Sequence, residues 1–184
     1  MSVADRSIDP RIKESAKEEF LQKGFLDASL QEICKNAGVT TGALYKRFKG
    51  KEELFCALVE STVQDLEEVV RQKSVLPATL TDEQLKKAWD MDREYMQWWF
   101  DYLYDRYDEM RLLLVFSDGT KYANFEHEWV ESMSHTTYAY YKEAQRRGLT
   151  KTDISEKELH VMLSSFWTAI CEPLIHGFSK EEAG

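Results

Sequence analysis

The sequence is short of turn-forming residues, of paired cysteines and of long apolar runs. Its 184 residues include only 8 Gly and 3 Pro, which excludes collagen-like and tail-like classes and favours helices. The three cysteines, Cys34, Cys56 and Cys171, form no Cys-x-x-Cys pair, so neither a disulfide framework nor a cysteine zinc site is indicated. No window approaches about 18 apolar residues and no signal-peptide pattern opens the chain, so we expect a cytoplasmic protein outside the membrane.

Motifs for catalysis and metal binding are missing as well. His127 and Glu128 begin a run like His-Glu-x-x-His, but Glu131 stands where the second histidine is needed. No Gly-x-Ser-x-Gly motif, Gly-rich phosphate loop or adjacent Cys/His pair occurs. We therefore expect no enzyme, no metal and no cofactor, and the four histidines are interpreted as surface or core polar residues.

The charge is unevenly distributed along the chain. Residues 1–51 hold 10 Lys and Arg against 7 Asp and Glu, a net charge of +3, whereas residues 52–184 carry −12 of the total of −9. This asymmetry is typical of a basic contact module on an acidic body. Ordinary surface variation is the alternative interpretation.

The first 50 residues contain the signals for three short helices. Asp9 and Pro10 are a good N-cap and first helical residue, and Gly24 is a C-terminal stop, so the pattern predicts a helix over 10–23. Its inward face recurs every four residues at Ile12, Ala16 and Phe20.

A second and a third helix follow closely. A capping box over 29–32 opens the second helix, Gly38 ends it, and Thr40 or Thr41 can cap the third. Two short helices joined by a glycine turn are typical of a helix-turn-helix. The third helix would turn Leu44 and Phe48 inward and expose Thr41, Gly42, Tyr45 and Lys46. On spacing alone, a plain helical hairpin with a solvated basic face remains the alternative.

Three motifs at fixed offsets within residues 30–54 resemble the DNA-binding segment of the TetR family of bacterial transcriptional regulators. They are Ile-x-x-x-Ala-Gly-Val over 33–39, Gly-x-Leu-Tyr-x-x-Phe over 42–48 and Lys-Glu-Glu-Leu over 51–54. The resemblance covers roughly residues 8–60 and implies an all-α fold. In that fold a three-helix DNA-binding head (1–51) is followed by a helical ligand-binding and dimerisation body (52–184), and the fourth helix spans the junction.

The resemblance also implies roles for individual residues at double-stranded DNA. Thr40, Thr41 and Tyr45 would meet phosphates, and Lys46 would reach a base edge or a phosphate. Gly42 would let the helix approach closely. Two further contacts would lie at helix N-termini: Ser29 and Lys51. Lys46 and Arg47 replace the histidine and aromatic residue frequent in the family. Because both add charge, we expect operator affinity to fall steeply with salt.

The body also reads as helix throughout, without strand-like alternation or internal repeats. The patterns predict helices over 52–73, 81–104, 107–117, 122–147 and 156–176. Aromatic residues are more numerous than a core of this size needs, and family members bind small molecules among these helices. The expected effector pocket is lined by Trp89, Tyr95, Met96, Trp99, Phe116, Phe125, Trp129, Tyr140 and Phe166. Acidic neighbours such as Asp92, Glu126 and Glu128 leave room for a cationic lipophilic ligand.

Dimerisation follows from the resemblance, because the last two family helices form a four-helix interface with a partner. Here the expected interface residues are Leu163, Trp167, Ile170 and Leu174, with Pro173 bending the helix. A further helix would start at 179–184; either it continues outside this sequence or the interface is abbreviated.

The expected function is a ligand-responsive repressor. It would bind a palindromic operator as a homodimer and be released by a small hydrophobic or aromatic effector, with the fourth helix as the lever. The alternative is a helical binding protein without DNA function. The effector, the operator, the regulated genes and the choice between repression and activation are not contained in the sequence.

Overall fold

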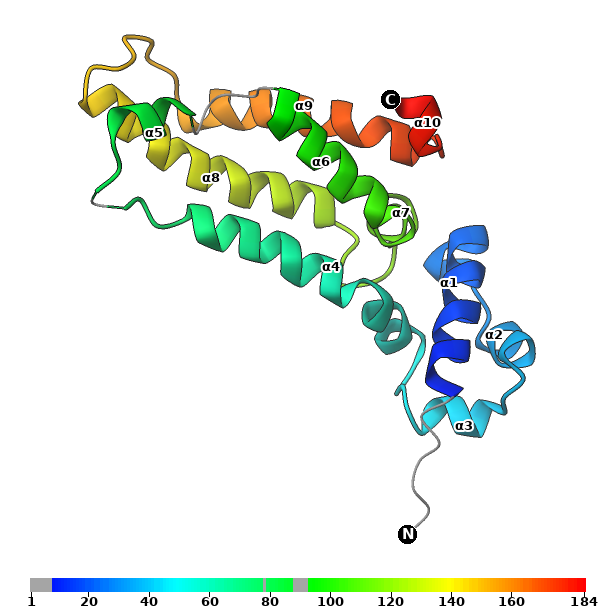
Figure 1. Ribbon diagram of the computed structural model, residues 1–184. Helices are drawn as coiled ribbons and strands as arrows, with labels where there is room; N and C mark the ends of the chain where they lie inside the picture. The colour runs from blue at the N-terminus through cyan, green and yellow to red at the C-terminus, as the bar shows by residue number, and fades with distance from the viewer. Residues whose placement is uncertain (1–7, 78, 88–92) are drawn as a thin grey trace. The chain divides into compact units, whose positions relative to one another are not determined.

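A computed structural model describes residues 8–77, 79–87 and 93–184. Every regular element in these ranges is helical, as expected (Figure 1). In chain order the helices are α1 (Ile8–Asp27), α2 (Leu30–Ala37), α3 (Thr41–Tyr45), α4 (Lys51–Lys73), α5 (Asp82–Lys87), α6 (Arg93–Asp105), α7 (Tyr107–Val115), α8 (Phe125–Arg146), α9 (Glu156–Ile175) and α10 (Lys180–Ala183). None of the helices in these ranges combines the length and hydropathy needed to span a bilayer.

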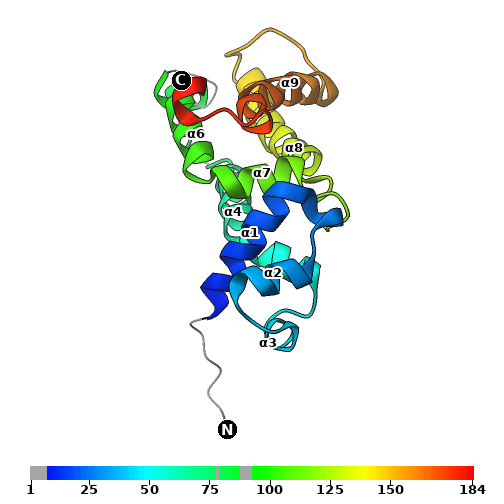
Figure 2. The ribbon, with the colours of Figure 1, turned by 90° about the vertical axis from the view of Figure 1, so that its right-hand side faces the viewer.

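The helices form two compact units. The N-terminal unit contains the chain up to Val63 together with Tyr107–Asn124, and the C-terminal unit contains Gln64–Arg106 together with Phe125–Gly184. The division therefore differs from the expected boundary at residue 51. The first half of α4 belongs to the same unit as α1 to α3, and α7 returns to that unit, where it lies against α1 (Figure 2).

The N-terminal unit is built on the face of α1 predicted from the four-residue spacing. Ile12, Ala16 and Phe20 are fully buried. The ring of Phe20 meets that of Phe55 from α4 edge to face, with centroids 5.2 Å apart, and Phe25 completes the cluster. The predicted stop at Gly24 is confirmed by its non-helical backbone (φ 74°, ψ 168°), after which one more helical turn reaches Asp27.

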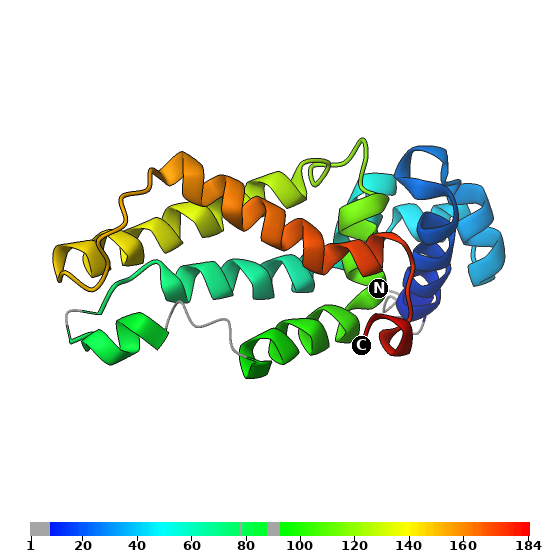
Figure 3. The same cartoon turned by 90° about the horizontal axis from the view of Figure 1, so that it is seen from above.

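Helices α8 and α9 lie side by side and form the centre of the C-terminal unit (Figure 3). The predicted capping box at Ser155 is confirmed, because its side chain accepts from the Glu158 N–H and the Glu158 side chain accepts from the Ser155 N–H. A cluster of three indoles joins α8 and α9 to α6. Trp167 lies 5.5 Å from Trp99 and 5.4 Å from Trp129 between ring centroids.

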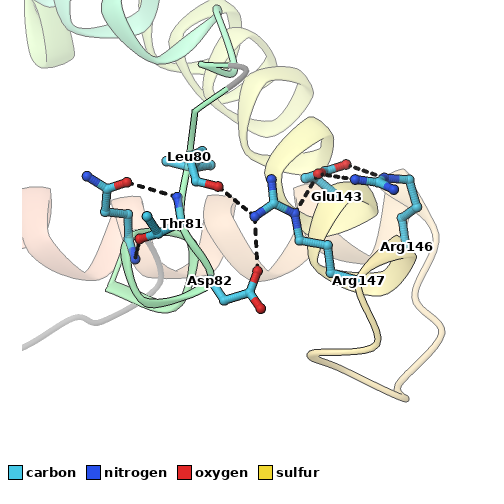
Figure 4. A network of polar contacts seen from close by, with 7 residues as sticks. Leu80, Thr81, Asp82, Glu143, Arg146 and Arg147 are labelled. Carbon is cyan, nitrogen blue, oxygen red and sulfur yellow. Dashed lines mark hydrogen bonds and ion pairs between the residues drawn. The ribbon is translucent and has the colours of Figure 1, made fainter.

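The C-terminal end of α8 is tied to the start of α5 by Arg147 (Figure 4). Its guanidinium donates to the carbonyl oxygen of Leu80 at 2.6 Å and pairs with Asp82 at 3.0 Å. The same group and Arg146 both donate to Glu143, and these hydrogen bonds lower the pKa of Glu143 to about 2. Arg147, which directly follows the last turn of α8, thereby holds the start of α5 against the end of α8.

Two expected helix boundaries differ in the structure. The helix expected over 81–104 corresponds to α5 and α6, and residues 88–92, which include Trp89 and Asp92, lie outside the described residues. The helix expected from residue 122 begins at Phe125. Tyr122 is held in the preceding turn, because its carbonyl oxygen accepts from the Ser117 hydroxyl and its N–H donates to Thr120.

Candidate functional site

The candidate site is the outer face of the helix-turn-helix formed by α2 and α3. Helix α2 begins at the N-cap Ser29, whose hydroxyl accepts from the Glu32 N–H at 3.4 Å. It ends at Gly38 in the left-handed conformation (φ 64°), where Gly tolerates a positive φ at no steric cost. Val39 donates to the Cys34 carbonyl oxygen at 2.9 Å and closes the turn. The N-cap at Ser29 and the stop at Gly38 are confirmed, and together they determine where α3 starts. The reciprocal half of the capping box predicted over 29–32 is not formed, because the Ser29 N–H donates to Glu19 and not to Glu32.

Helix α3 has an inner and an outer face, as its sequence predicts. Leu44 is fully buried and Phe48 is 8% exposed, so both belong to the core. Thr40 is the N-cap and accepts from the Ala43 N–H at 3.2 Å. The remaining predicted contact residues of α3 are all exposed: Thr41, Gly42, Tyr45 and Lys46.

The exposed residues of α3 suit a polyanionic surface. Tyr45 presents a half-exposed ring and hydroxyl, and Lys46 has no ion-pair partner among the described residues. A side chain at residue 42 would fit within the fold, because a Cβ there would meet only the Thr40 hydroxyl, at 3.9 Å. The lack of a side chain at residue 42 is therefore not required by packing within this chain.

The N–H of Ser29 is already used inside the chain. It donates to the Glu19 carboxylate at 3.0 Å, and Lys23 donates to the same oxygen at 2.8 Å. Burial alone would raise the pKa of Glu19, but these two hydrogen bonds hold the pKa below its usual value. The half-buried hydroxyl of Ser29 can still donate a hydrogen bond to a phosphate.

Lys51 is engaged within the N-terminal unit. Its Nζ donates to the carbonyl oxygens of Leu26 at 2.8 Å and Ala28 at 3.0 Å, and it stands 4.8 Å from the centre of the Phe25 ring. The contact of Lys51 with the DNA backbone stays a prediction, and within the chain its ammonium group is held by two backbone carbonyl oxygens. These carbonyl oxygens, of Leu26 and Ala28, lie at the end of α1 and in the turn before α2.

Arg47 also departs from the expectation drawn from its charge. It is 14% exposed, forms an ion pair with Asp9 and donates to the Ala43 carbonyl oxygen at 3.2 Å. Arg47 therefore joins α3 to the start of α1 and does not add a free positive charge. Of the two residues that depart from the family pattern, Lys46 is the one that adds an exposed positive charge.

Two further exposed cations, Arg11 and Lys49, lie near this face. The guanidinium of Arg11 lies 3.8 Å from where a Cβ on Gly38 would stand, so it covers the turn of the helix-turn-helix. Lys49 follows α3, and its N–H donates to Glu53 at 2.8 Å. Both positions could be recognised in the sequence, because Arg11 is a basic residue just after a helix start and Lys49 is one just after a helix end.

The residues expected to line an effector pocket do not form one group. Met96 and Trp99 line a groove of about 420 Å³ between α6, α9 and α10. Phe125 and Trp129 are buried in the C-terminal unit, where Tyr95, Tyr140 and Phe166 are partly exposed. Phe116 belongs to the N-terminal unit, and its expected place in an effector pocket stays a prediction. Its carbonyl oxygen accepts from the Phe25 N–H at 3.1 Å.

The expected interface residues on α9 also separate into two kinds. Trp167 is 5% exposed and Leu174 is fully buried, so both pack inside the chain and are corrected as interface residues. Leu163 and Ile170 are partly exposed. The apolar side chains that α9 does expose are Val161 and Met162, at 63% and 60%.

An all-helical chain with a capped, exposed helix after a glycine turn has the architecture of a helix-turn-helix DNA-binding protein. Comparison with known proteins places it more narrowly. Residues 12–58 match the family model described as bacterial regulatory proteins, tetR family. The chain is 44% identical over 57 residues to the HTH-type transcriptional regulator SrpR of Pseudomonas putida, and 49% identical over 51 residues to AcrR of Shigella flexneri. These matches cover 31% and 26% of this chain but only 27% and 24% of the relatives.

Solved structures extend the similarity to the whole fold. PfmR of Thermus thermophilus, a TetR family regulator, superposes with a TM-score of 0.62 at 16% identity, covering 96% of this chain and 88% of PfmR. NalD of Pseudomonas aeruginosa superposes with a TM-score of 0.61 at 17% identity, covering 95% and 98%. Residues 12–58 are thus similar to the DNA-binding segment of TetR-family regulators, and the chain shares its fold with solved structures of such regulators. Its matched relatives are named as transcriptional regulators, in agreement with the expectation that it is not an enzyme.

Proposed function

We propose that this protein is a cytoplasmic transcriptional repressor that binds a palindromic DNA operator as a homodimer and is released by a small hydrophobic effector. The observation that carries the proposal is the outer face of α3. Leu44 on its inner side and Phe48 just after the helix are buried, while Tyr45 and Lys46 are exposed. An acidic chain that keeps a basic face on a capped helix-turn-helix is suited to bind the DNA backbone at that face.

A homodimer is proposed because a five-residue recognition helix makes few contacts in one major groove. Two copies on successive grooves double those contacts. The outer side of α9 is the candidate interface, since Val161 and Met162 expose apolar area there next to the partly exposed Leu163. The substitution M162A should weaken the dimer, which sedimentation equilibrium would detect.

Effector control requires that the ligand bind one arrangement of the two DNA-binding heads more tightly than another. Helix α4 contributes residues to both compact units, which supports its proposed role as lever. Helix α7 is a second candidate. It packs in the N-terminal unit, where Lys17 pairs with Asp108 at 3.2 Å, yet it is joined in sequence to α6 and α8 of the C-terminal unit.

Selection from a random pool of DNA duplexes, at two salt concentrations, tests the proposal. We expect a palindrome to be enriched and its retention to fall steeply with salt. Y45A and K46A should each abolish or strongly weaken this enrichment, whereas K86A, an exposed cation on α5, should not. If nothing is enriched while small hydrophobic molecules still bind, the alternative of a helical binding protein without DNA function is favoured.

A further inference from the structure

The groove between α6, α9 and α10 combines apolar walls with a single cation. Its volume of about 420 Å³ lies in the usual range for small-molecule sites, roughly 300–1,000 Å³. Figures 2 and 3 show α10 lying beside α6. The walls are formed mainly by Met96, Trp99, Phe100, Leu103, Ile170 and Pro173.

The lysine of α10 beside this groove is already paired. Lys180 lies 2.8 Å from Asp101 and 3.6 Å from Asp105, and none of these three lines the groove. The hydrogen bond from Lys180 lowers the pKa of Asp101. The Tyr104 hydroxyl donates to the Phe178 carbonyl oxygen at 3.2 Å and holds the chain before α10 against α6.

Arg93 is the charged side chain that lines the groove within the described residues. It is exposed, and the described part of the chain offers it neither an ion pair nor a hydrogen bond. A guanidinium beside apolar walls attracts a carboxylate, which it can bind through two parallel hydrogen bonds, and it repels a cation. The apolar walls favour a hydrocarbon or aromatic body on the same molecule.

We propose that this groove binds an amphipathic carboxylate, with its acid group on Arg93 and its apolar part between α6 and α9. This ligand is an anion, whereas the acidic residues Asp92, Glu126 and Glu128 had suggested a cationic ligand. Glu126 accepts from the Thr168 hydroxyl at 3.2 Å, and neither Glu126 nor Glu128 lines the groove. The idea that such a ligand acts as the effector rests on the proposed function. The idea that it binds in the groove is independent of that function.

Calorimetry of the full chain with three probes of equal chain length tests the charge preference. The probes are decanoate, decanol and decyltrimethylammonium, each below its micellar concentration. We expect decanoate to bind at least about tenfold more tightly than decanol, the size of one charge-assisted hydrogen bond, and the cation to bind most weakly. R93Q should remove the preference, while K87Q, an exposed cation on α5, should preserve it.

Two further variants test the place of binding. M96W and Q97W would each fill part of the groove, and either one that retains the wild-type melting temperature should lose decanoate binding. Equal affinity for decanoate and decanol, stronger binding of the cation, or unchanged decanoate affinity in R93Q would each overturn the proposal.

The effect on DNA separates this inference from the proposed function. Release of the operator by decanoate in the wild type, absent in R93Q, would support both. Binding in the groove without release would leave the groove assignment standing and remove the effector role. A wild type that binds decanoate through Arg93 but selects no DNA would overturn the proposed function alone.

Discussion

The amide N–H of Phe25 donates to the carbonyl oxygen of Phe116 at 3.1 Å. This hydrogen bond joins the turn after Gly24 to the C-terminal end of α7, two segments about ninety residues apart in the chain. It requires the backbone of α1 to leave its helical path at Gly24 (φ 74°, ψ 168°), a conformation essentially restricted to glycine. This hydrogen bond between α1 and the end of α7 therefore depends on one glycine.

Replacement of Gly24 by alanine should destabilise the N-terminal unit. The strained backbone costs about 1–3 kcal/mol of unfolding free energy, although a Cβ would meet only Phe116, at 3.8 Å. Urea unfolding of G24A measures the loss. G50A is the matched control, because Gly50 has no positive φ and nothing within 4 Å of a Cβ, so its stability should stay close to wild type.

Replacement of Gly42 by alanine should separate stability from DNA binding. The fold has room for the methyl group, and alanine favours a helix over glycine by up to about 1 kcal/mol. The melting temperature of G42A should therefore equal or exceed that of the wild type. Because α3 would approach the DNA less closely, operator affinity in a gel-shift titration should fall; unchanged affinity would contradict the placement of Gly42 at the interface.

Lys51 and Lys46 should behave differently although both were predicted to contact DNA. K51A removes two hydrogen bonds from a charged donor to Leu26 and Ala28, which should cost about 1–3 kcal/mol of unfolding free energy. K46A should leave stability unchanged. Each phosphate contact contributes about 0.9 to the slope of log affinity against log salt, so K46A should reduce that slope by about 1. An equal reduction in K51A would show that Lys51 also binds phosphate.

Glu19 should make the N-terminal unit sensitive to acid. Its folded-state pKa is lowered, so its ionised form stabilises the fold at pH values above the unfolded-state pKa of about 4.3. That stabilisation is lost as pH falls through the lower folded-state value. The difference in unfolding free energy between wild type and E19Q should therefore be largest near neutral pH and shrink below about pH 4.3. A difference independent of pH would contradict this account.

The sequence predicted best what depends on near neighbours. The caps at Ser29 and Ser155 and the glycine stops at Gly24 and Gly38 involve partners within a few residues, so their motifs can be read directly. The same is true of the inner residues of α3, whose spacing is that of a helix.

Residues with distant partners were predicted less well. Arg47 looked like an added surface charge because Asp9 is 38 positions away, and Lys51 looked free because its acceptors are backbone carbonyl groups. Trp167 and Leu174 looked like interface residues, because helical periodicity identifies an apolar face without saying which chain covers it.

The all-helical fold, the helix-turn-helix and the resemblance of residues 12–58 to TetR-family regulators could be predicted from the sequence, because caps, turn glycines and spacing act over one or two helical turns. The folded chain was needed to show that α7 joins the N-terminal unit, that Lys51 and Arg47 are engaged within the chain, and that Arg93 lines an apolar groove. Those outcomes depend on contacts between residues remote in sequence, whose pairing is set by packing of the whole unit and not by any local pattern.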